Sequence, residues 1–137
     1  MWWIYALLSA LFAALTAIFA KIGVTNVNSN LATAIRTVII LLVAWGIVLA
    51  RGEGKELASI SKSNLFFLVI SGLATGLSWI FYFKALQIGK VSQVAPVDKL
   101  SLALTLLLSF VFLKEALTIK TAIGAALIIA GTLVMIL

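Results

Sequence analysis

The sequence predicts an all-α integral membrane protein, a five-transmembrane-helix bundle formed by a single domain over residues 1–137. Two observations support this fold class. The chain is 64% hydrophobic and only 10% charged, whereas soluble proteins average about 25% charged residues. Its apolar residues gather into five runs of the length that a helix needs to cross a ~30 Å hydrocarbon core. The runs cover residues 4–20, 31–50, 65–83, 91–113 and 119–137.

The first two runs are bounded by interfacial residues and by helix breakers. Aromatic residues anchor helices at membrane interfaces, and the first helix begins beside Trp2, Trp3 and Tyr5. The longest connection, residues 51–64, is polar and contains the helix-breaking glycines Gly52 and Gly54. It predicts a short loop with no room for a soluble domain.

Small residues mark the third and fifth runs as packing helices. Gly72 and Gly76 form a GxxxG pair, which lets another helix backbone approach closely. The fifth run carries Gly124 and Gly131 among alanines and has few polar groups. We expect these glycines to face other helices, within the subunit or at a dimer contact.

The fourth run has two possible starting points. It begins at Val91 if the apolar pattern is followed, as a broken or cavity-lining start with Asp98 and Lys99 in the first half of the run. Proline is favoured at the first helical position, so the helix also has a plausible start at Pro96. Lys99 would then lie within snorkelling reach of the interface. The two side chains point ~100° apart on a helix, so we expect Asp98 and Lys99 not to pair.

Charged residues inside the runs are the main candidates for function. Arg36 lies roughly 8 Å past the start of its run and Lys99 roughly 12 Å past Val91, at 1.5 Å per residue. With Asp98 and Lys84, which is expected to end the third helix, they fall in the membrane half opposite the N-terminus. Ionisable groups in a membrane usually face a bundle interior or watery cavity, so this clustering predicts a vestibule with Lys84 at its periphery.

Polar side chains recur at helical spacing beside these charges. The two stripes are Asp98, Ser101, Thr105 and Ser109 on the fourth helix and Ser71, Thr75, Ser78 and Tyr82 on the third. They either line a solute path or make the interhelical contacts that hydroxyls often make in membranes. Trp79 and Tyr82 either form an aromatic wall for a solute or belong to the interfacial belt or the core.

The odd number of spans suggests a symmetric assembly. Five crossings leave the termini on opposite sides, and transporters are often built from two inverted repeats around a midplane site. The ten basic residues divide five to five, and without the buried Arg36 and Lys99 the loop count is five to three. That weak bias permits insertion in both orientations. We therefore expect an antiparallel homodimer with a small-molecule solute bound between the subunits.

Several function classes are excluded by composition. The net charge is +6, but the basic residues form no cluster with interleaved aromatics, so nucleic acid is not an expected partner. The absence of cysteine and histidine leaves no thiolate or imidazole for a metal. Beyond Asp98 the chain has no acid/base constellation, so we expect no enzyme activity and no cofactor.

The order of several short motifs resembles a known family, the EamA domain of the drug/metabolite transporter superfamily, in a single-domain, half-size form. The similar stretches are Lys21-Ile22-Gly23, Arg36, Ala85-Leu86-Gln87-Ile88-Gly89, Val94-Ala95-Pro96, Phe112-Leu113-Lys114-Glu115, Leu117-Thr118, Gly124, Leu127-Ile128 and Gly131. The resemblance covers the whole chain. Members usually carry two such domains in ten helices, whereas this sequence has one.

The resemblance implies a multi-pass carrier in the plasma membrane of a bacterium or archaeon, commonly one that exports amino acids or other small metabolites. Arg36 and Lys99 are expected to attract an anionic group such as a carboxylate, with Asp98 as counter-ion or coupling site. Two alternatives stay open, an accessory or assembly subunit and a small flippase for a lipid-linked substrate.

Overall fold

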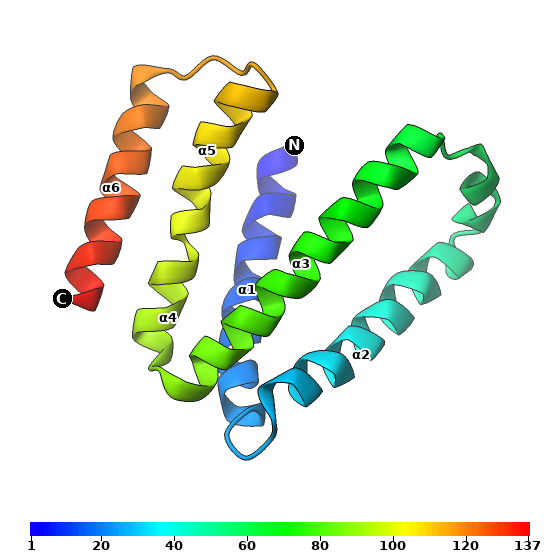
Figure 1. Cartoon of the computed structure of the whole chain (residues 1–137). Helices are drawn as coiled ribbons and strands as arrows, with labels where there is room; N and C mark the ends of the chain where they lie inside the picture. Colours follow the sequence, from blue (N-terminus) through cyan, green and yellow to red (C-terminus); the bar gives the residue numbers. More distant parts are fainter. The chain divides into compact units, whose positions relative to one another are not determined.

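The computed structural model describes all residues from 1 to 137, and every long element in it is a helix (Figure 1). The elements are α1 (Trp2–Gly23), α2 (Ser29–Ala50), the 3-10 helix η1 (Glu53–Ser59), α3 (Lys62–Ile88), α4 (Val91–Asp98), α5 (Leu100–Phe112) and α6 (Ile119–Ile136). Five spans are long and apolar enough to cross a membrane, with α4 and α5 forming one of them. The predicted fold class is therefore confirmed.

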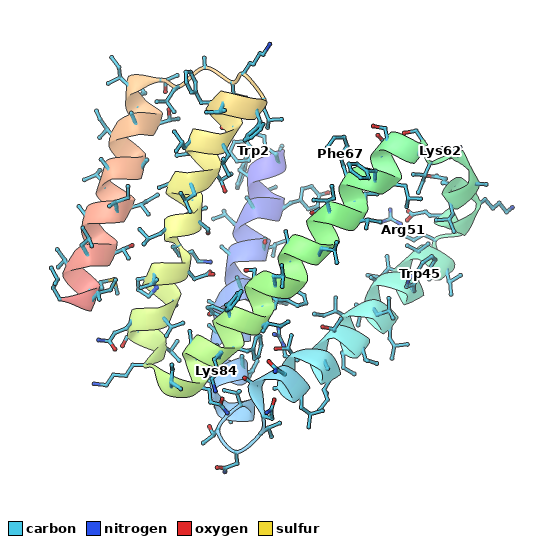
Figure 2. The ribbon with its side chains drawn as sticks, in the orientation of Figure 1. Trp2, Trp45, Arg51, Lys62, Phe67 and Lys84 are labelled. Atoms are coloured by element: carbon cyan, nitrogen blue, oxygen red, sulfur yellow. The ribbon has the colours of Figure 1, made fainter.

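The length of α3 explains the position of two lysines. Its 27 residues span ~40 Å at 1.5 Å per residue, more than the ~30 Å hydrocarbon core. Lys62 and Lys84 are separated by ~33 Å along it, and Figure 2 shows them toward opposite ends of the helix. Both ammonium groups can therefore reach an interface by snorkelling. Lys84 does not end this helix, as the sequence suggested, because α3 continues for one more turn to Ile88.

The chain divides into two compact units, and one of them is residues Phe19–Gln87. In this unit α2 leads through η1 into α3, so that the two long helices form a hairpin (Figure 1). Its buried apolar residues come from the end of α1, the following turn and the end of α3. They are Ala20, Val24, Phe83 and Leu86.

Polar side chains tie the connection between α1 and α2 to the last turns of α3. The Lys21 ammonium donates to the Leu86 carbonyl at 2.6 Å, and the Gln87 amide donates to the Val27 carbonyl at 2.9 Å. A positive charge at a helix C-terminus also stabilises the helix, because it compensates the partial negative charge of the last carbonyls. Asn28 caps α2 by accepting from Asn30 N–H at 2.9 Å. These bonds fix the start of α2 against the end of α3.

The other unit comprises residues Met1–Ile18 and Ile88–Leu137. In it α5 and α6 run side by side and are joined by residues 113–118 (Figure 1). The span before that connection is interrupted, because α4 ends at Asp98 and α5 begins at Leu100.

Pro96 lies inside α4, three residues before the interruption at Lys99. Proline has no N–H to donate and its ring crowds the carbonyl four residues earlier. Just beyond it, the Lys99 N–H donates to the carbonyls of Pro96 at 3.0 Å and Ala95 at 3.3 Å. The buried Thr132 hydroxyl of α6 also donates to the Pro96 carbonyl, at 3.2 Å. The break is thus held by a side chain from the neighbouring helix.

The structure decides three expectations about element boundaries. The fourth helix starts at Val91, with Pro96 inside it, so the alternative start at Pro96 is wrong. The run over residues 91–113 is two helical segments, in agreement with the alternative of a broken helix. The connection at 51–64 contains the 3-10 helix η1 in place of an irregular loop, and Gly52 precedes η1 with a φ of +69°. Glycine adopts that left-handed conformation without a Cβ clash.

The amide of Gln87 should contribute measurably to stability. Gln87→Leu removes its hydrogen bond to the Val27 carbonyl, and losing one such bond typically costs about 0.5–1.5 kcal/mol. We expect a lower unfolding midpoint for this variant in detergent, measured by circular dichroism during denaturant titration. The matched control is Gln93→Leu, because Gln93 is the second of the chain's two glutamines and is exposed. Equal midpoints for the two variants would contradict a structural role for the Gln87 amide.

Candidate functional site

The candidate site in the Phe19–Gln87 unit centres on Arg36. This residue lies seven positions after the first residue of α2, a rise of ~10 Å along the helix. Its guanidinium carbon is 4.3 Å from the centroid of the Phe83 ring and 5.5 Å from that of Trp79. Aromatic faces attract a cation, most strongly where water is excluded. Arg36 therefore links α2 to α3 through two rings.

Helical spacing explains why Arg36 points toward α3. Ser29, Thr33 and Arg36 follow one another at intervals of four and three residues, which places them on one face of α2. Ser29 and Thr33 are buried and Arg36 is half-buried. Trp79 and Phe83 likewise share a face of α3, four residues apart. The site is thus formed where two helix faces meet.

One donor of the Arg36 guanidinium has no partner. Nη1 is buried, and no atom of the protein accepts a hydrogen bond from it. The ring faces attract its charge, but they are not hydrogen-bond acceptors for a group lying over them. Leaving a buried donor unpaired costs about 1–3 kcal/mol, and more for a charged group. The site is therefore short of an acceptor.

Two lysines contact the same stretch of α3. Lys21 bonds the Leu86 carbonyl, and the Lys84 ammonium lies 3.4 Å from the Gln87 side-chain oxygen. With Arg36 over Phe83, three cationic side chains approach residues 83–87. The two acids of this unit, Glu53 and Glu56, lie in η1 beyond the opposite end of α2. This end of the unit therefore carries positive charge without a carboxylate of its own.

Asp98 and Lys99 belong to the other unit and form an ion pair. The Lys99 ammonium is 3.3 Å from the Asp98 carboxylate, with the two side chains 54% and 35% exposed. The expectation that these neighbours would not pair is wrong. Asp98 is the last residue of α4, and Lys99 lies at the break before α5. A half-exposed pair of this kind contributes little to stability.

In the predicted polar stripes, some hydroxyl groups donate to backbone carbonyls of their own helix. Thr75 donates to the Ser71 carbonyl at 2.9 Å, and Ser109 donates to the Leu106 carbonyl at 3.0 Å. Ser101 and Thr105 are exposed on α5. The helix break at Lys99 separates them from Asp98, so the predicted stripe does not run along one continuous helix.

The aromatic residues of α3 are arranged around the Arg36 contact. Trp79 contacts the guanidinium, and the Tyr82 ring meets the Phe83 ring edge to face at 6.1 Å between centroids. Phe83 was not among the candidate residues, although its position four residues after Trp79 places it on the same face of the helix. Gln87 was also missed as a contact, although it belongs to the motif that carried the family resemblance.

The glycines expected to pack helices face open space within their own units. A Cβ added to Gly72, Gly76, Gly124 or Gly131 would have no atom within 4 Å apart from the nearby backbone of its own helix. The close backbone approach that a GxxxG pair permits is therefore not made by the helices of the same unit.

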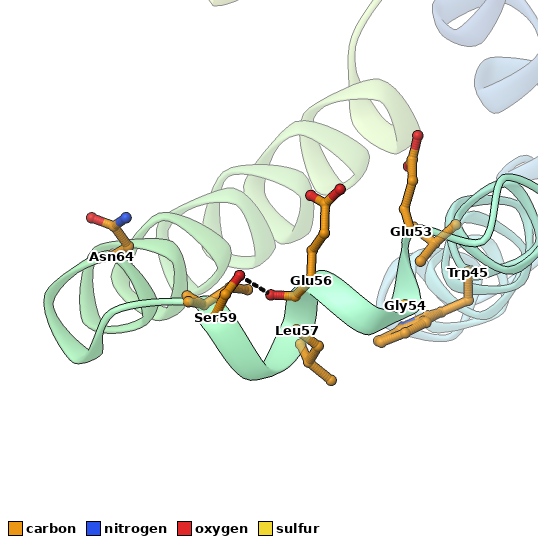
Figure 3. A pocket seen from close by; sticks show the side chains of 9 residues that line it. Trp45, Glu53, Gly54, Glu56, Leu57, Ser59 and Asn64 are labelled. Carbon is orange, nitrogen blue, oxygen red and sulfur yellow. Dashed lines mark hydrogen bonds between the residues drawn. The ribbon is translucent and has the colours of Figure 1, made fainter.

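A separate hollow of about 450 Å³ lies at the η1 end of the Phe19–Gln87 unit. Figure 3 shows Trp45, Glu53, Glu56, Leu57, Ser59 and Asn64 around it. Glu53 already pairs with Arg51 at 3.0 Å, on side chains that are largely exposed. None of the candidate residues lines this hollow, so it does not contribute to the Arg36 site.

Comparison with known proteins places the chain in a family. Residues 1–137 match the EamA-like transporter family. A Sinorhizobium protein named as an uncharacterized transporter in the cobO 3′ region is 48% identical over 134 residues, which cover 98% of this chain and 95% of that protein. An uncharacterized protein of Methanocaldococcus jannaschii is 30% identical over 132 residues, covering 96% and 93% of the two chains. No solved structure matches. The chain belongs to the EamA-like transporter family.

The contact between Arg36 and Phe83 can be measured by a double-mutant cycle. We expect Arg36→Gln and Phe83→Leu to be coupled by about 0.5–2 kcal/mol, because each removes one partner of a partly desolvated cation–π contact. The measurement is the unfolding free energy of the two single variants and the double variant in detergent.

The chain's other arginine provides the control for this cycle. Arg51 is exposed and pairs with Glu53, so Arg51→Gln should combine additively with Phe83→Leu to within about 0.5 kcal/mol. Additivity of the Arg36→Gln pair as well would show that the ring does not stabilise the guanidinium.

Proposed function

We propose that this member of the EamA-like transporter family is a secondary transporter that exports a small, amino-acid-like metabolite across the plasma membrane. It works as an antiparallel homodimer with alternating access. A single chain provides five spans, and two such chains in opposite orientations reproduce the inverted-repeat arrangement of many secondary transporters. Solute would bind near the midplane while one bundle rocks against the other.

The observation that carries this proposal is the length of the relatives. The match covers 95% of the Sinorhizobium transporter and 93% of the archaeal protein. These relatives are therefore also about one five-span unit long. A bacterial and an archaeal protein of this length both fit a transporter assembled from separate, identical units.

The open glycine surfaces are consistent with assembly. Four glycines have open space where a side chain would lie in their own units. They are Gly72 and Gly76 on α3 and Gly124 and Gly131 on α6. Small residues let helices of two chains approach closely in a membrane, where dispersion forces and hydrogen bonds drive association. A second copy of the chain would fill this space.

The charged residues in the spans are proposed to serve the solute pathway. Arg36, Asp98 and Lys99 lie within spans that are long and apolar enough to cross a membrane. A charge there costs ~2.5–3.5 kcal/mol on insertion scales at the helix centre, so it is retained where it has a use. We assign anion attraction to Arg36 and Lys99, with Asp98 as the coupling or counter-ion group. Ser101 and Thr105 would add hydroxyls to the pathway, and Lys84 a charge at its rim.

The antiparallel arrangement predicts that the chain inserts in both orientations. Reporter fusions at the C-terminus should be active on both sides of the membrane, because the loop charges give only a weak orientation bias. Removing Lys62 and Lys120, both on the N-terminal side, should shift the ratio of the two orientations. Signal from one side alone, unchanged in that variant, would contradict the antiparallel homodimer and favour a parallel or mixed assembly.

The assigned pathway residues predict the effects of substitution on transport. Arg36→Ala and Asp98→Asn should each reduce solute counterflow into proteoliposomes at least tenfold while leaving expression and assembly largely intact. A panel of labelled amino acids provides the substrate. Lys55→Gln, in the exposed η1 helix, is the control and should retain native flux. Native flux in both pathway variants would favour the reading as an accessory or assembly subunit.

A further inference from the structure

The unpartnered donor of Arg36 identifies a position for a ligand. Arg36 is the only arginine in a membrane-spanning helix of this chain, and its Nη1 is buried without an acceptor. A guanidinium presents its N–H groups in its own plane, at its edges. The Phe83 ring, 4.3 Å away, covers one face of this plane. A ligand that satisfies Nη1 therefore approaches along an edge of the guanidinium.

The missing acceptor does not come from a carboxylate of the same unit. Its two glutamates lie in η1, which begins seventeen residues after Arg36, or ~25 Å along α2. Two lysines of the same unit add further positive charge. Lys21 on α1 bonds the Leu86 carbonyl, and Lys84 on α3 lies beside Gln87. An anion at Arg36 would be attracted by all three.

We propose that Arg36 binds a carboxylate of the transported solute through the edge that includes Nη1. This assignment rests on the proposed transport function and names its substrate class, a small carboxylic acid in its ionised form. Arginine and carboxylate form two parallel hydrogen bonds in one plane. A carboxylate paired in this way lies coplanar with the guanidinium, and its two oxygens supply the acceptors that the protein lacks.

Two features favour a carboxylate with an apolar portion. Phe83 and Trp79 flank the guanidinium, so the solute atoms next to the charged group meet aromatic carbon. A carboxylate also matches the planar fork of Arg36, because its two coplanar oxygens accept two parallel N–H groups. Lysine cannot substitute fully for this arginine, because an ammonium is a point charge without the planar fork.

The test uses Trp79 as a reporter in purified protein in uncharged detergent. Trp2, Trp3 and Trp45 are replaced by phenylalanine, which leaves Trp79 as the only tryptophan, 5.5 Å from Arg36. Cyclohexanecarboxylate is titrated while tryptophan emission is recorded, beside its uncharged isostere cyclohexanecarboxamide. We expect a saturable change with the carboxylate and at least tenfold weaker binding of the amide. Equal binding of the two compounds, or no saturable change, would overturn the assignment.

Two conservative variants separate the fork from the charge. Arg36→Lys keeps the positive charge and should weaken carboxylate binding at least tenfold, whereas Arg51→Lys, at the exposed arginine, should leave it unchanged. The comparison of acid and amide on the otherwise native site decides the question even if Arg36→Lys does not fold. Native affinity in a folded Arg36→Lys variant would contradict recognition by the planar fork.

Phosphate sources are tested by competition. Inorganic phosphate and detergent micelles containing phosphatidylglycerol should each displace cyclohexanecarboxylate at least tenfold less effectively than acetate does. Stronger displacement by either would assign the edge of Arg36 to a phosphate in place of a carboxylate. Binding to the variant with Trp79 as its only tryptophan requires neither insertion in two orientations nor solute flux. The binding result therefore stands even if the homodimer or the transport activity is disproved.

Discussion

A guanidinium within a helix apolar enough to span a membrane is the constraint on which the Phe19–Gln87 unit depends. Arg36 cannot lie against lipid without a large desolvation cost, so α2 must present it to something that attracts a cation. Phe83 and Trp79 provide two aromatic faces without adding a second buried charge. The arrangement fixes the register of α2 against α3, and it leaves one N–H unpaired. A structural role and a binding role therefore coexist in the same side chain.

The remaining polar contacts serve the same part of the molecule. Lys21 and Gln87 tie the turn between α1 and α2 to the last turns of α3, which brings the start of α2 close to Phe83. The motifs around these two residues, Lys21-Ile22-Gly23 and Ala85-Leu86-Gln87-Ile88-Gly89, are thus joined in space by hydrogen bonds. In the other unit, a span is interrupted at Lys99, and Thr132 bonds the Pro96 carbonyl beside the interruption. Backbone groups freed inside a membrane are tolerated where neighbouring side chains satisfy them in this way.

Much of the fold follows from the sequence because lipid imposes few choices on a backbone. An apolar run of sufficient length must form a helix that bonds its own N–H and C=O groups, so the number and order of spans could be predicted from composition and run length. The family could also be predicted, since its motifs occur in order along the chain, and residues 1–137 match it. Helix ends were less predictable. The runs mark where apolar residues stop, whereas α3 continues past Lys84 because a lysine near a helix end can snorkel.

What only the tertiary structure decided is which groups meet. The sequence singled out Arg36 by its depth, but the choice of Phe83 as its main partner depends on how α2 is rotated and tied to α3. Asp98 and Lys99 pair at the break between α4 and α5, a boundary that the apolar run does not mark. Run length and charge depth are local properties of a chain in lipid, and the sequence determines them alone. Contacts between helices arise from long-range packing, where side chains far apart in sequence compete for the same space.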